Sequence, residues 1–191
     1  MALLPLLDRI NDLKRLPRTG WLLAGIAPVE SVADHALATA LLALILAEAV
    51  NADLPTAQLE TPLNIAEVLS IALLHDLAEC VLTDLPHRAT DLLTPAVKHD
   101  AERAGLMGIT RSLPDGSAWV DKWEAYAAGS SPEARLVRDA DKLELAHQAL
   151  RYALSGRRGL DDFLAPRAYH YAQSDALAAE ISQAYARIDG C

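Results

Sequence analysis

The 191-residue chain contains little of what marks a secreted or disulfide-bonded protein. It has two cysteines, Cys80 inside an apolar run and Cys191 at the last position, and neither has a CxxC partner. So sparse a pattern argues against a disulfide scaffold and is typical of a reducing compartment. Residues 1–16 lack a basic leading region and reach Asp8 after a short apolar run. We therefore expect no secretory signal and a cytoplasmic protein.

Basic residues are also in short supply. The 17 Lys and Arg residues are outnumbered by 26 Asp and Glu residues, which gives a formal net charge of -9 and a sequence pI near 5.0. Because a surface with this average charge repels the phosphate backbone of DNA and RNA, we expect no long nucleic acid as a partner. A small anionic substrate stays compatible with the composition if a few basic side chains gather locally.

Long apolar runs and strand-like alternation are both missing. The longest apolar run, residues 36–47, falls short of the roughly 20 residues that span a bilayer, so it favours a buried core helix and no membrane partner. The chain also has no internal repeat and no low-complexity tract. Since 52% of its residues are hydrophobic, it can build a substantial core. We predict an all-α fold, a single-domain helical bundle over residues 1–191.

What the chain does have is hydrophobic residues at helical spacing, interrupted by recognisable start and stop signals. Ser31 with Asp34 resembles a capping box, and Ser131 followed by Pro132 is a typical helix start. Pro17 closes the first periodic segment. Helices are predicted at about residues 3–17, 32–50, 65–82, 96–113, 119–126, 132–154 and 174–188.

The predicted helix at residues 65–82 carries ionisable side chains in an otherwise apolar pattern. His75, Asp76 and Glu79 are its only acidic, basic or histidine residues from position 68 to 82. Their i, i+3 and i, i+4 spacing places all three on one side of a helix. Because burying such groups is costly unless they are paired or bind a metal, we predict that they serve one small site.

His35 raises the same question near the start of the predicted helix at residues 32–50. A lone histidine on an apolar face is more often a core residue than a ligand, so the combination with the His-Asp pair carries the prediction. Imidazole nitrogens and carboxylate oxygens are both good ligands for divalent Mn, Fe, Co, Ni or Zn. A further ligand is available in the segment RDADKLELA, where Asp139 and Asp141 point to different sides of a helix. Periodicity leaves the choice between these two open.

Five segments of the chain carry a family resemblance: LKRLPRTGW at 13–21, PVESVADH at 28–35, HDLAE at 75–79, TDLP at 83–86 and KWEAYAAGSSPEARLVRDADKLE at 122–144. In their order and flanking residues these segments resemble the HD-domain superfamily of metal-dependent phosphohydrolases, and within it the 5'-deoxynucleotidase branch. The likeness covers about residues 13–163, which we take as the core of the domain. It implies a helical HD-type fold, one divalent metal ion (Mn, Co, Fe, Ni, Zn or Mg) and a nucleotide substrate, and it is compatible with a homodimer.

The resemblance implies a metal-binding and catalytic set. It makes His35, His75, Asp76 and Asp141 the metal ligands, and Asp141 is preferred to Asp139 because the helical run KLELA follows it. Glu79 matches the acidic residue that positions or deprotonates the attacking water. The implied reaction is hydrolysis of 2'-deoxyribonucleoside 5'-monophosphates to deoxynucleoside and phosphate.

The resemblance also implies three substrate-binding residues. Asp84 matches the catalytic-site position beside the sugar, Arg18 matches a basic residue that holds the phosphate, and Trp21 matches the aromatic residue that shapes the sugar pocket. In some members the arginine and tryptophan are adjacent, whereas two residues separate them here. Each position also has an ordinary interpretation: Arg18 as a surface charge, Trp21 as a core residue and Asp84 as a turn cap.

Two other functions stay open at this point. The first is an HD phosphohydrolase that acts on a ribonucleotide, a cyclic nucleotide or a triphosphate, because a fold alone does not determine its substrate. The second is a non-catalytic HD-fold binding module whose polar cluster is only a core feature. Because all four metal ligands that the resemblance implies are present, the sequence argues against a non-catalytic binding module.

Overall fold

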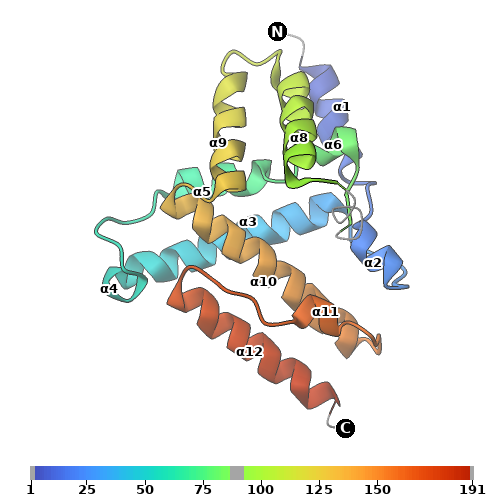
Figure 1. Ribbon diagram of the computed structural model, residues 1–191, viewed down its shortest axis with the longest axis vertical. Coiled ribbons are helices and arrows are strands. Elements are labelled where there is room, and N and C mark those ends of the chain that lie inside the picture. The colour runs from blue at the N-terminus through green and yellow to red at the C-terminus, as the bar shows by residue number, and fades with distance from the viewer. Residues whose placement is uncertain (1–2, 87–92, 190–191) are drawn as a thin grey trace. The chain divides into compact units, whose positions relative to one another are not determined.

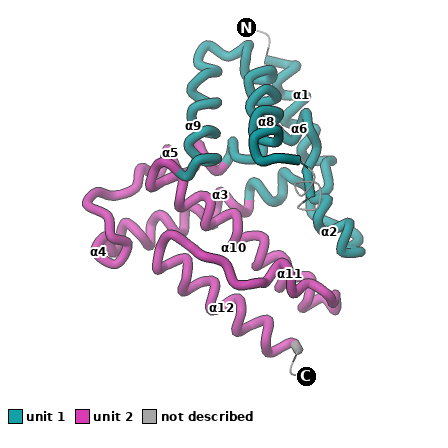
Figure 2. The backbone as a smooth tube through the Cα atoms, in the orientation of Figure 1, with its two compact units in different colours: residues 1–37, 73–129 teal, residues 38–72, 130–191 magenta. Residues whose placement is uncertain are grey.

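The computed structural model describes residues 3–86 and 93–189, and over these residues the chain is helical without a strand (Figure 1). An isolated antiparallel bridge joins Pro17 and Ser31. The all-α prediction is confirmed. The chain divides into two compact units, residues 1–37 with 73–129 and residues 38–72 with 130–191 (Figure 2). That residues 1–191 act as a single domain stays a prediction.

Unit 1 contains α8 and α9, which lie side by side, and α1 and α6, which both contact α8 (Figure 1). Trp119 and Trp123, which lie in the helix predicted at about residues 119–126, pack on the core of this unit. The other buried core residues include Leu13, Val32 and Leu106. The elements of unit 1 are α1 (Leu4–Asp12), α2 (Thr19–Leu23), the start of α3 (Val32–Ala52), the end of α5 (Ile65–Leu74), α6 (Glu79–Leu82), α8 (Pro95–Thr110) and α9 (Gly116–Ala128).

Unit 2 is organised around α10 (Pro132–Leu154), which runs beside α12 (Ala172–Asp189) (Figure 1). The short helix α11 (Asp161–Leu164) also contacts α10. The Tyr171 hydroxyl donates to the Pro132 carbonyl at 2.8 Å, which fixes the start of α12 to the start of α10. The remaining elements of the unit are the rest of α3, α4 (Leu54–Ala57) and most of α5.

The predicted helix starts are confirmed in their capping contacts. The Ser31 amide donates to Asp34 Oδ2 at 2.8 Å, and the Asp34 amide donates back to Ser31 Oγ at 3.1 Å, which completes the capping box of α3. Ser131 Oγ accepts from the Ala134 amide at 3.0 Å at the start of α10. Such a cap typically stabilises a helix by about 1 kcal/mol.

The prediction of one continuous helix over residues 65–82 is wrong. The structure ends α5 at Leu74, passes through turns at residues 75–78 and begins α6 at Glu79. In the turn region the backbone bonds span three residues, as from the Glu79 amide to the Asp76 carbonyl at 3.1 Å. A three-residue turn is tighter than an α-helix and is frequent where a helix is under local constraint. The His-Asp pair therefore lies in a turn between two helices.

Three segments that lie outside the predicted helices contain short helices. α2 lies in the segment after Pro17, α4 follows Asp53, and α11 follows the turn at residues 155–160. Asp53 caps α4 through its side chain, which accepts from the Thr56 amide at 3.3 Å. The first helix also ends at Asp12, earlier than predicted. Residues 87–92, between the helices predicted at residues 65–82 and 96–113, lie outside the described residues.

In the described ranges α3 is the one helix that is long and apolar enough to cross a membrane, judged by length and composition. The expectation of a core helix holds on one side of α3, where Ala43 and Val50 are fully buried. On another side Leu37, Leu41 and Ile45 follow at i, i+4 and i+8 and are 54–61% exposed. We call these three residues the apolar stripe of α3.

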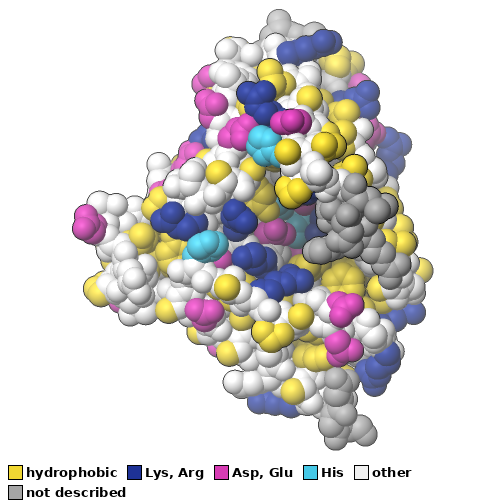
Figure 3. Space-filling model, in the orientation of Figure 1, with side chains coloured by type: hydrophobic (Ala, Val, Ile, Leu, Met, Phe, Trp, Pro, Cys, Tyr) yellow, Lys and Arg dark blue, Asp and Glu magenta, His cyan; other side chains and the backbone are white. Residues whose placement is uncertain are grey.

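Charge on the surface is mixed but not uniform. On the face in Figure 3, acidic and hydrophobic side chains are interspersed, whereas dark-blue Lys and Arg side chains gather over α10 and the segment before α12. The acidic composition is compatible with a small anionic ligand only if basic side chains gather locally, and this region is such a gathering.

Candidate metal centre

His35, His75 and Asp76 meet in the interior of unit 1. His35 is the fourth residue of α3, and the turn after α5 carries the other two. The Nε2 atoms of the two histidines are 3.3 Å apart, and Asp76 Oδ2 lies 3.5 Å from His35 Nε2 and 3.2 Å from His75 Nε2. Both imidazole side chains are fully buried. The structure thus brings together three of the four residues that the family resemblance implies as ligands, and that they bind a metal stays a prediction.

The three donor atoms fit a divalent metal ion. Metal–ligand distances of about 2.0–2.2 Å place neighbouring ligand atoms roughly 2.8–3.6 Å apart for octahedral to tetrahedral angles. The observed distances of 3.2, 3.3 and 3.5 Å fall within this range. Two neutral imidazole acceptors that face each other at 3.3 Å also repel unless a proton or a cation lies between them. The residues present therefore fit the predicted ion.

Arg18 joins this cluster to a second carboxylate. Its Nη1 donates to Asp76 Oδ2 and to Asp84 Oδ1, each at 3.3 Å. Burial alone would raise the pKa of Asp76, but His75, Arg18 and His35 together hold that pKa below its usual range. Arg18 is 15% exposed in its side chain, so the interpretation as a simple surface charge is not supported.

Asp84 is held from both sides. Besides the contact with Arg18, its Oδ2 accepts from the Thr19 amide, and its carbonyl accepts from Thr19 Oγ1 at 3.0 Å. The preceding residue, Thr83, has a φ of +75°, which is uncommon for a β-branched residue and persists where the surroundings determine it. This backbone turn directs Asp84 into the cluster, where it is 7% exposed. The predicted site residue thus lies beside the predicted phosphate-binding arginine.

Glu79 begins α6 and has an unusual environment. Its Oε2 is buried, and none of the described residues provides it with a hydrogen-bond partner. Burial raises the pKa of Glu79, and the charges of Asp76 and Asp84 raise it further, to about 10, although Arg18 and His35 act in the opposite direction. A buried carboxyl oxygen without a hydrogen-bond partner costs stability. It is expected at a functional site, where a ligand or a reacting water supplies the missing partner.

Trp21 is 1% exposed, and its indole Nε1 donates to Glu30 Oε1 at 2.8 Å. Its burial favours the core interpretation, in which the ring supports the segment that carries Arg18. The Arg18 amide also donates to the Glu30 carbonyl at 3.1 Å. The sequence reasoning gave Glu30 no role, although it lies within the family-like segment at 28–35. Direct contact of Trp21 with a sugar stays a prediction.

Tyr126 is a second residue that the sequence reasoning did not place at the site. Its ring packs edge-on against His75, with ring centroids 5.3 Å apart and planes inclined at 66°. Such packing restrains the imidazole and excludes solvent from one of its faces. The signal available in the sequence was only the helical spacing of Trp119, Trp123 and Tyr126, which does not indicate which residue the tyrosine contacts.

Asp141 lies on α10 and belongs to unit 2, so its place among the ligands stays a prediction. The contacts of Asp139 bear on the choice between these two aspartates. Asp139 is fully buried, and its carboxylate accepts from the amides of His170 at 2.8 Å and Tyr171 at 3.2 Å. It also contacts His170 Nδ1 at 2.8 Å. Because Asp139 is occupied in binding the chain before α12, Asp141 is the better candidate for a ligand.

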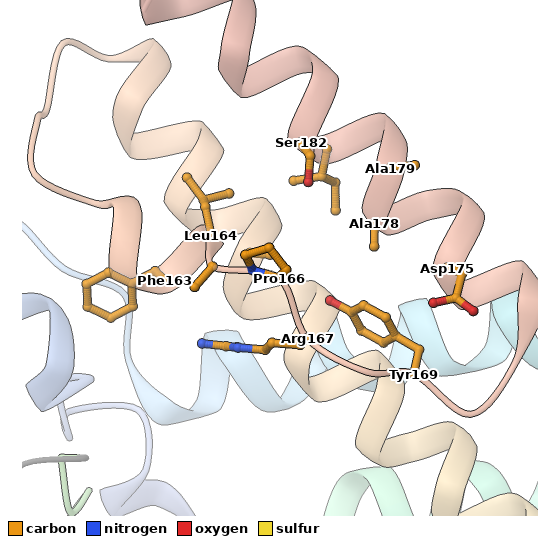
Figure 4. Close-up of a pocket in the computed structure, with 12 residues that line it drawn as sticks. Phe163, Leu164, Pro166, Arg167, Tyr169, Asp175, Ala178, Ala179 and Ser182 are labelled. Atoms are coloured by element: carbon orange, nitrogen blue, oxygen red, sulfur yellow. The ribbon is translucent and has the colours of Figure 1, made fainter.

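Unit 2 also contains a cavity of about 150 Å³ between α10 and the segment 163–182 (Figure 4). In Figure 4 Tyr169 and Pro166 border this space, and Ala178 and Ala179 line it from α12. Its lining is largely apolar and includes a single carboxylate, Asp175. A divalent metal needs several such donors, so this cavity is not the predicted centre.

The fold and the site define a class of protein. The HD domain family matches residues 10–182, and the chain belongs to that family. It is 35% identical over 160 residues to the 5'-deoxynucleotidase HDDC2 of Danio rerio, covering 82% of this chain and 73% of that protein. It is 32% identical over 153 residues to the 5'-deoxynucleotidase HDDC2 of Homo sapiens, covering 79% of this chain and 68% of that protein. Among solved structures, the PH0347 protein from Pyrococcus horikoshii OT3 is similar with a TM-score of 0.79 and 30% identity, covering 94% of this chain and 98% of that one.

Proposed function

We propose that this chain is a metal-dependent phosphomonoesterase that hydrolyses 2'-deoxyribonucleoside 5'-monophosphates to a deoxynucleoside and phosphate. The observation that carries the proposal is the convergence of His35, His75 and Asp76 within 3.5 Å of one another, with Arg18 bound to the same aspartate. The names of the zebrafish and human relatives, both 5'-deoxynucleotidases, agree with this substrate class.

In this proposal His35, His75, Asp76 and Asp141 hold one divalent ion, drawn from Mn, Co, Fe, Ni, Zn or Mg. Such an ion, when bound, supplies positive charge that polarises a phosphoryl oxygen and favours ionised forms of nearby acids. Arg18 holds the phosphate by charge-assisted hydrogen bonds. Its hydrogen bonds to Asp76 and Asp84 keep the guanidinium in position for that contact. Phosphate monoester hydrolysis is extremely slow without a catalyst, so both positioning and charge neutralisation are needed.

Glu79 accepts the proton of the attacking water. Its buried Oε2 has no partner among the described residues and is therefore available for that proton. With a pKa of about 10 the carboxyl is protonated at neutral pH in the metal-free protein, so it becomes a base only when added positive charge lowers that pKa. Water attacks phosphorus as Glu79 takes one of its protons, and the bond from phosphorus to the 5'-oxygen breaks. Glu79 then gives up that proton, through solvent water, to the leaving 5'-oxygen, so the products are the deoxynucleoside and phosphate and Glu79 is regenerated.

For the sugar, Asp84 accepts a hydrogen bond from the 3'-hydroxyl and anchors the ring. We assign the discrimination between deoxyribose and ribose to the wall that Trp21 supports. An added 2'-hydroxyl without a partner against an apolar wall costs about 1 to 3 kcal/mol, or roughly 5- to 150-fold in kcat/KM. The roles of Asp84 and Trp21 are supported by the family resemblance and by their closeness in the fold to Arg18, the proposed phosphate-binding residue.

The test is a comparison of kcat/KM for dAMP and AMP by phosphate release. We expect dAMP to be preferred within the range above, a narrower ratio for Trp21→Ala, and slower turnover of both substrates for Asp84→Asn. Equal kcat/KM values in the unmodified protein would contradict the proposed specificity and favour a broader nucleotide phosphohydrolase.

We further propose that the protein is a cytoplasmic homodimer without a membrane partner, with the apolar stripe of α3 as part of the interface. The stripe is exposed on a single chain, and burying it in a second copy removes three large apolar side chains from water. Light scattering should then give the dimer mass for the unmodified protein and the monomer mass for Ile45→Glu. Leu154→Glu, which alters a residue 56% exposed at the end of α10, is the matched control and should stay dimeric.

A further inference from the structure

Glu30 lies where two segments of unit 1 run side by side, the one that carries Arg18 and the one that begins α3 and carries His35. The Arg18 amide donates to the Glu30 carbonyl at 3.1 Å, and the Val32 amide donates to the Leu16 carbonyl at 2.8 Å. These backbone hydrogen bonds fix the two segments against each other. The main chain of Glu30 takes part in this pairing, and its carboxylate makes separate contacts.

The Glu30 carboxylate lies close to two rings of the site. Its Oε1 accepts from Trp21 Nε1 at 2.8 Å, and a carboxylate oxygen of Glu30 lies within 4.8 Å of a ring nitrogen of His35. Trp21 and His35 are both buried, and Glu30 is half-buried beside them. A carboxylate that is partly withdrawn from water is costly unless it accepts hydrogen bonds, so these two rings are the donors that its position favours.

His35 has to present one particular nitrogen to the metal centre. Its Nε2 lies 3.3 Å from His75 Nε2 and 3.5 Å from Asp76 Oδ2, so Nδ1 is directed away from the centre. A neutral imidazole carries a single N–H, and only its unprotonated nitrogen can bind a metal. Binding through Nε2 therefore requires the proton on Nδ1. A carboxylate next to Nδ1 favours this tautomer, because an ionised carboxylate only accepts hydrogen bonds.

We infer that Glu30 is a positioning residue whose carboxylate accepts from His35 Nδ1 as well as from Trp21 Nε1. It thereby keeps His35 Nε2 unprotonated and directed at the ion. This inference rests on the proposed function, since it takes His35 as a metal ligand. Because the same carboxylate holds the Trp21 ring, Glu30 also connects the metal centre to the wall proposed for the sugar.

The experiment measures the affinity of the metal-free protein for Zn²⁺ by competition with a chromogenic chelator, with no nucleotide present. Glu30→Gln keeps the size of the side chain, but it has one acceptor oxygen where the carboxylate has two, and an amide donor replaces the other. While that oxygen accepts from the Trp21 indole, the amide N–H faces His35. It then favours the tautomer protonated at Nε2, which cannot bind the ion.

Two controls separate this role from a loss of charge and from a loosened fold. Glu48→Gln removes the same charge from an exposed position of α3. Leu16→Ala weakens the packing of the segment paired with Glu30 and changes no polar side chain. The melting temperature of each metal-free variant in EDTA records its change in stability separately from zinc binding.

We expect Glu30→Gln to bind Zn²⁺ about 10- to 100-fold more weakly, the range typical for loss of a residue that orients a metal-binding histidine. Both controls should bind Zn²⁺ as the unmodified protein does, although Leu16→Ala should melt at a lower temperature. A second measurement needs no variant. In the zinc-loaded unmodified protein, imidazole ¹H–¹⁵N correlation spectra should show the proton of His35 on Nδ1.

Equal zinc affinity of Glu30→Gln and Glu48→Gln would overturn the inference, and so would an equal loss of affinity in Leu16→Ala. A proton on Nε2 of His35 in the zinc-loaded protein would overturn it without any variant, and that spectrum decides alone if Glu30→Gln does not fold. An unmodified protein that binds no zinc would also overturn it. Failure of the proposed function has a different signature: zinc binding that depends on Glu30, in a protein that releases no phosphate from dAMP, would support the inference and contradict that function.

Discussion

Glu79 offers a perturbation whose effects on stability and on catalysis have opposite signs. Its pKa rises from an ordinary value of 4.5 to about 10 in the folded, metal-free protein. Below pH 4.5 both the folded and the unfolded state hold the proton, so the group has no effect on stability. Between pH 4.5 and about 10 the unfolded state loses the proton while the folded state keeps it, and the folded state becomes progressively less stable as pH rises.

At pH 7 this difference in pKa costs about 3 kcal/mol of unfolding free energy. Glu79→Gln keeps the shape and removes the titration in both states, so the metal-free variant should be more stable than the unmodified protein by about that amount. For a chain of this size the melting temperature should rise by roughly 6 to 12 °C. The same change removes the proposed base, and turnover of dAMP should fall by about 10² to 10⁴.

The assay is thermal unfolding in EDTA at pH 4 and pH 7, paired with phosphate release from the metal-loaded protein. Glu48→Gln, at an exposed position of α3, is the control and should change neither quantity. The reasoning is refuted if Glu79→Gln fails to stabilise the metal-free protein at pH 7, or if it stabilises it equally at pH 4. Loss of bound metal in this variant would make Glu79 a ligand rather than a base.

Two further outcomes follow from the structure. His75→Ala and Asp76→Ala should each reduce bound transition metal, measured by elemental analysis, from about one ion per chain to a small fraction, because each removes one donor of a closely spaced set; unchanged metal content in both would show that the ligands lie elsewhere. Ser131→Ala should lower the unfolding free energy by about 1 kcal/mol and the melting temperature by roughly 2 to 4 °C, since the Ala134 amide loses its cap, and an unaltered melting curve would contradict the capping role.

The helices were predictable because their signals are local. The capping residues Ser31 and Ser131 begin α3 and α10 as predicted, and the hydrophobic periodicity locates the remaining long helices. The interruption of the helix at residues 75–78 was not predictable, because no glycine or proline marks it. Its cause lies in contacts that span many residues, such as the one between His75 and His35.

The site shows the same division between local and distant signals. Polar residues in an apolar helix identified His75 and Asp76, and the family resemblance supplied Arg18 and Asp84, which the structure places together with them. Periodicity could not choose between the two aspartates of α10, because the choice depends on hydrogen bonds to residues more than thirty positions away. Glu30 was missed for a related reason, since its role depends on the bond to Trp21 across a turn.

The most direct test of the central claim is phosphate release from dAMP by one protein preparation before EDTA treatment, after it, and after addition of Mn, Co, Mg or Zn. The account predicts activity that EDTA abolishes, that at least one of these ions restores, and that no ion restores in His75→Ala. Activity that survives complete removal of metal, or full activity of His75→Ala, would contradict the account.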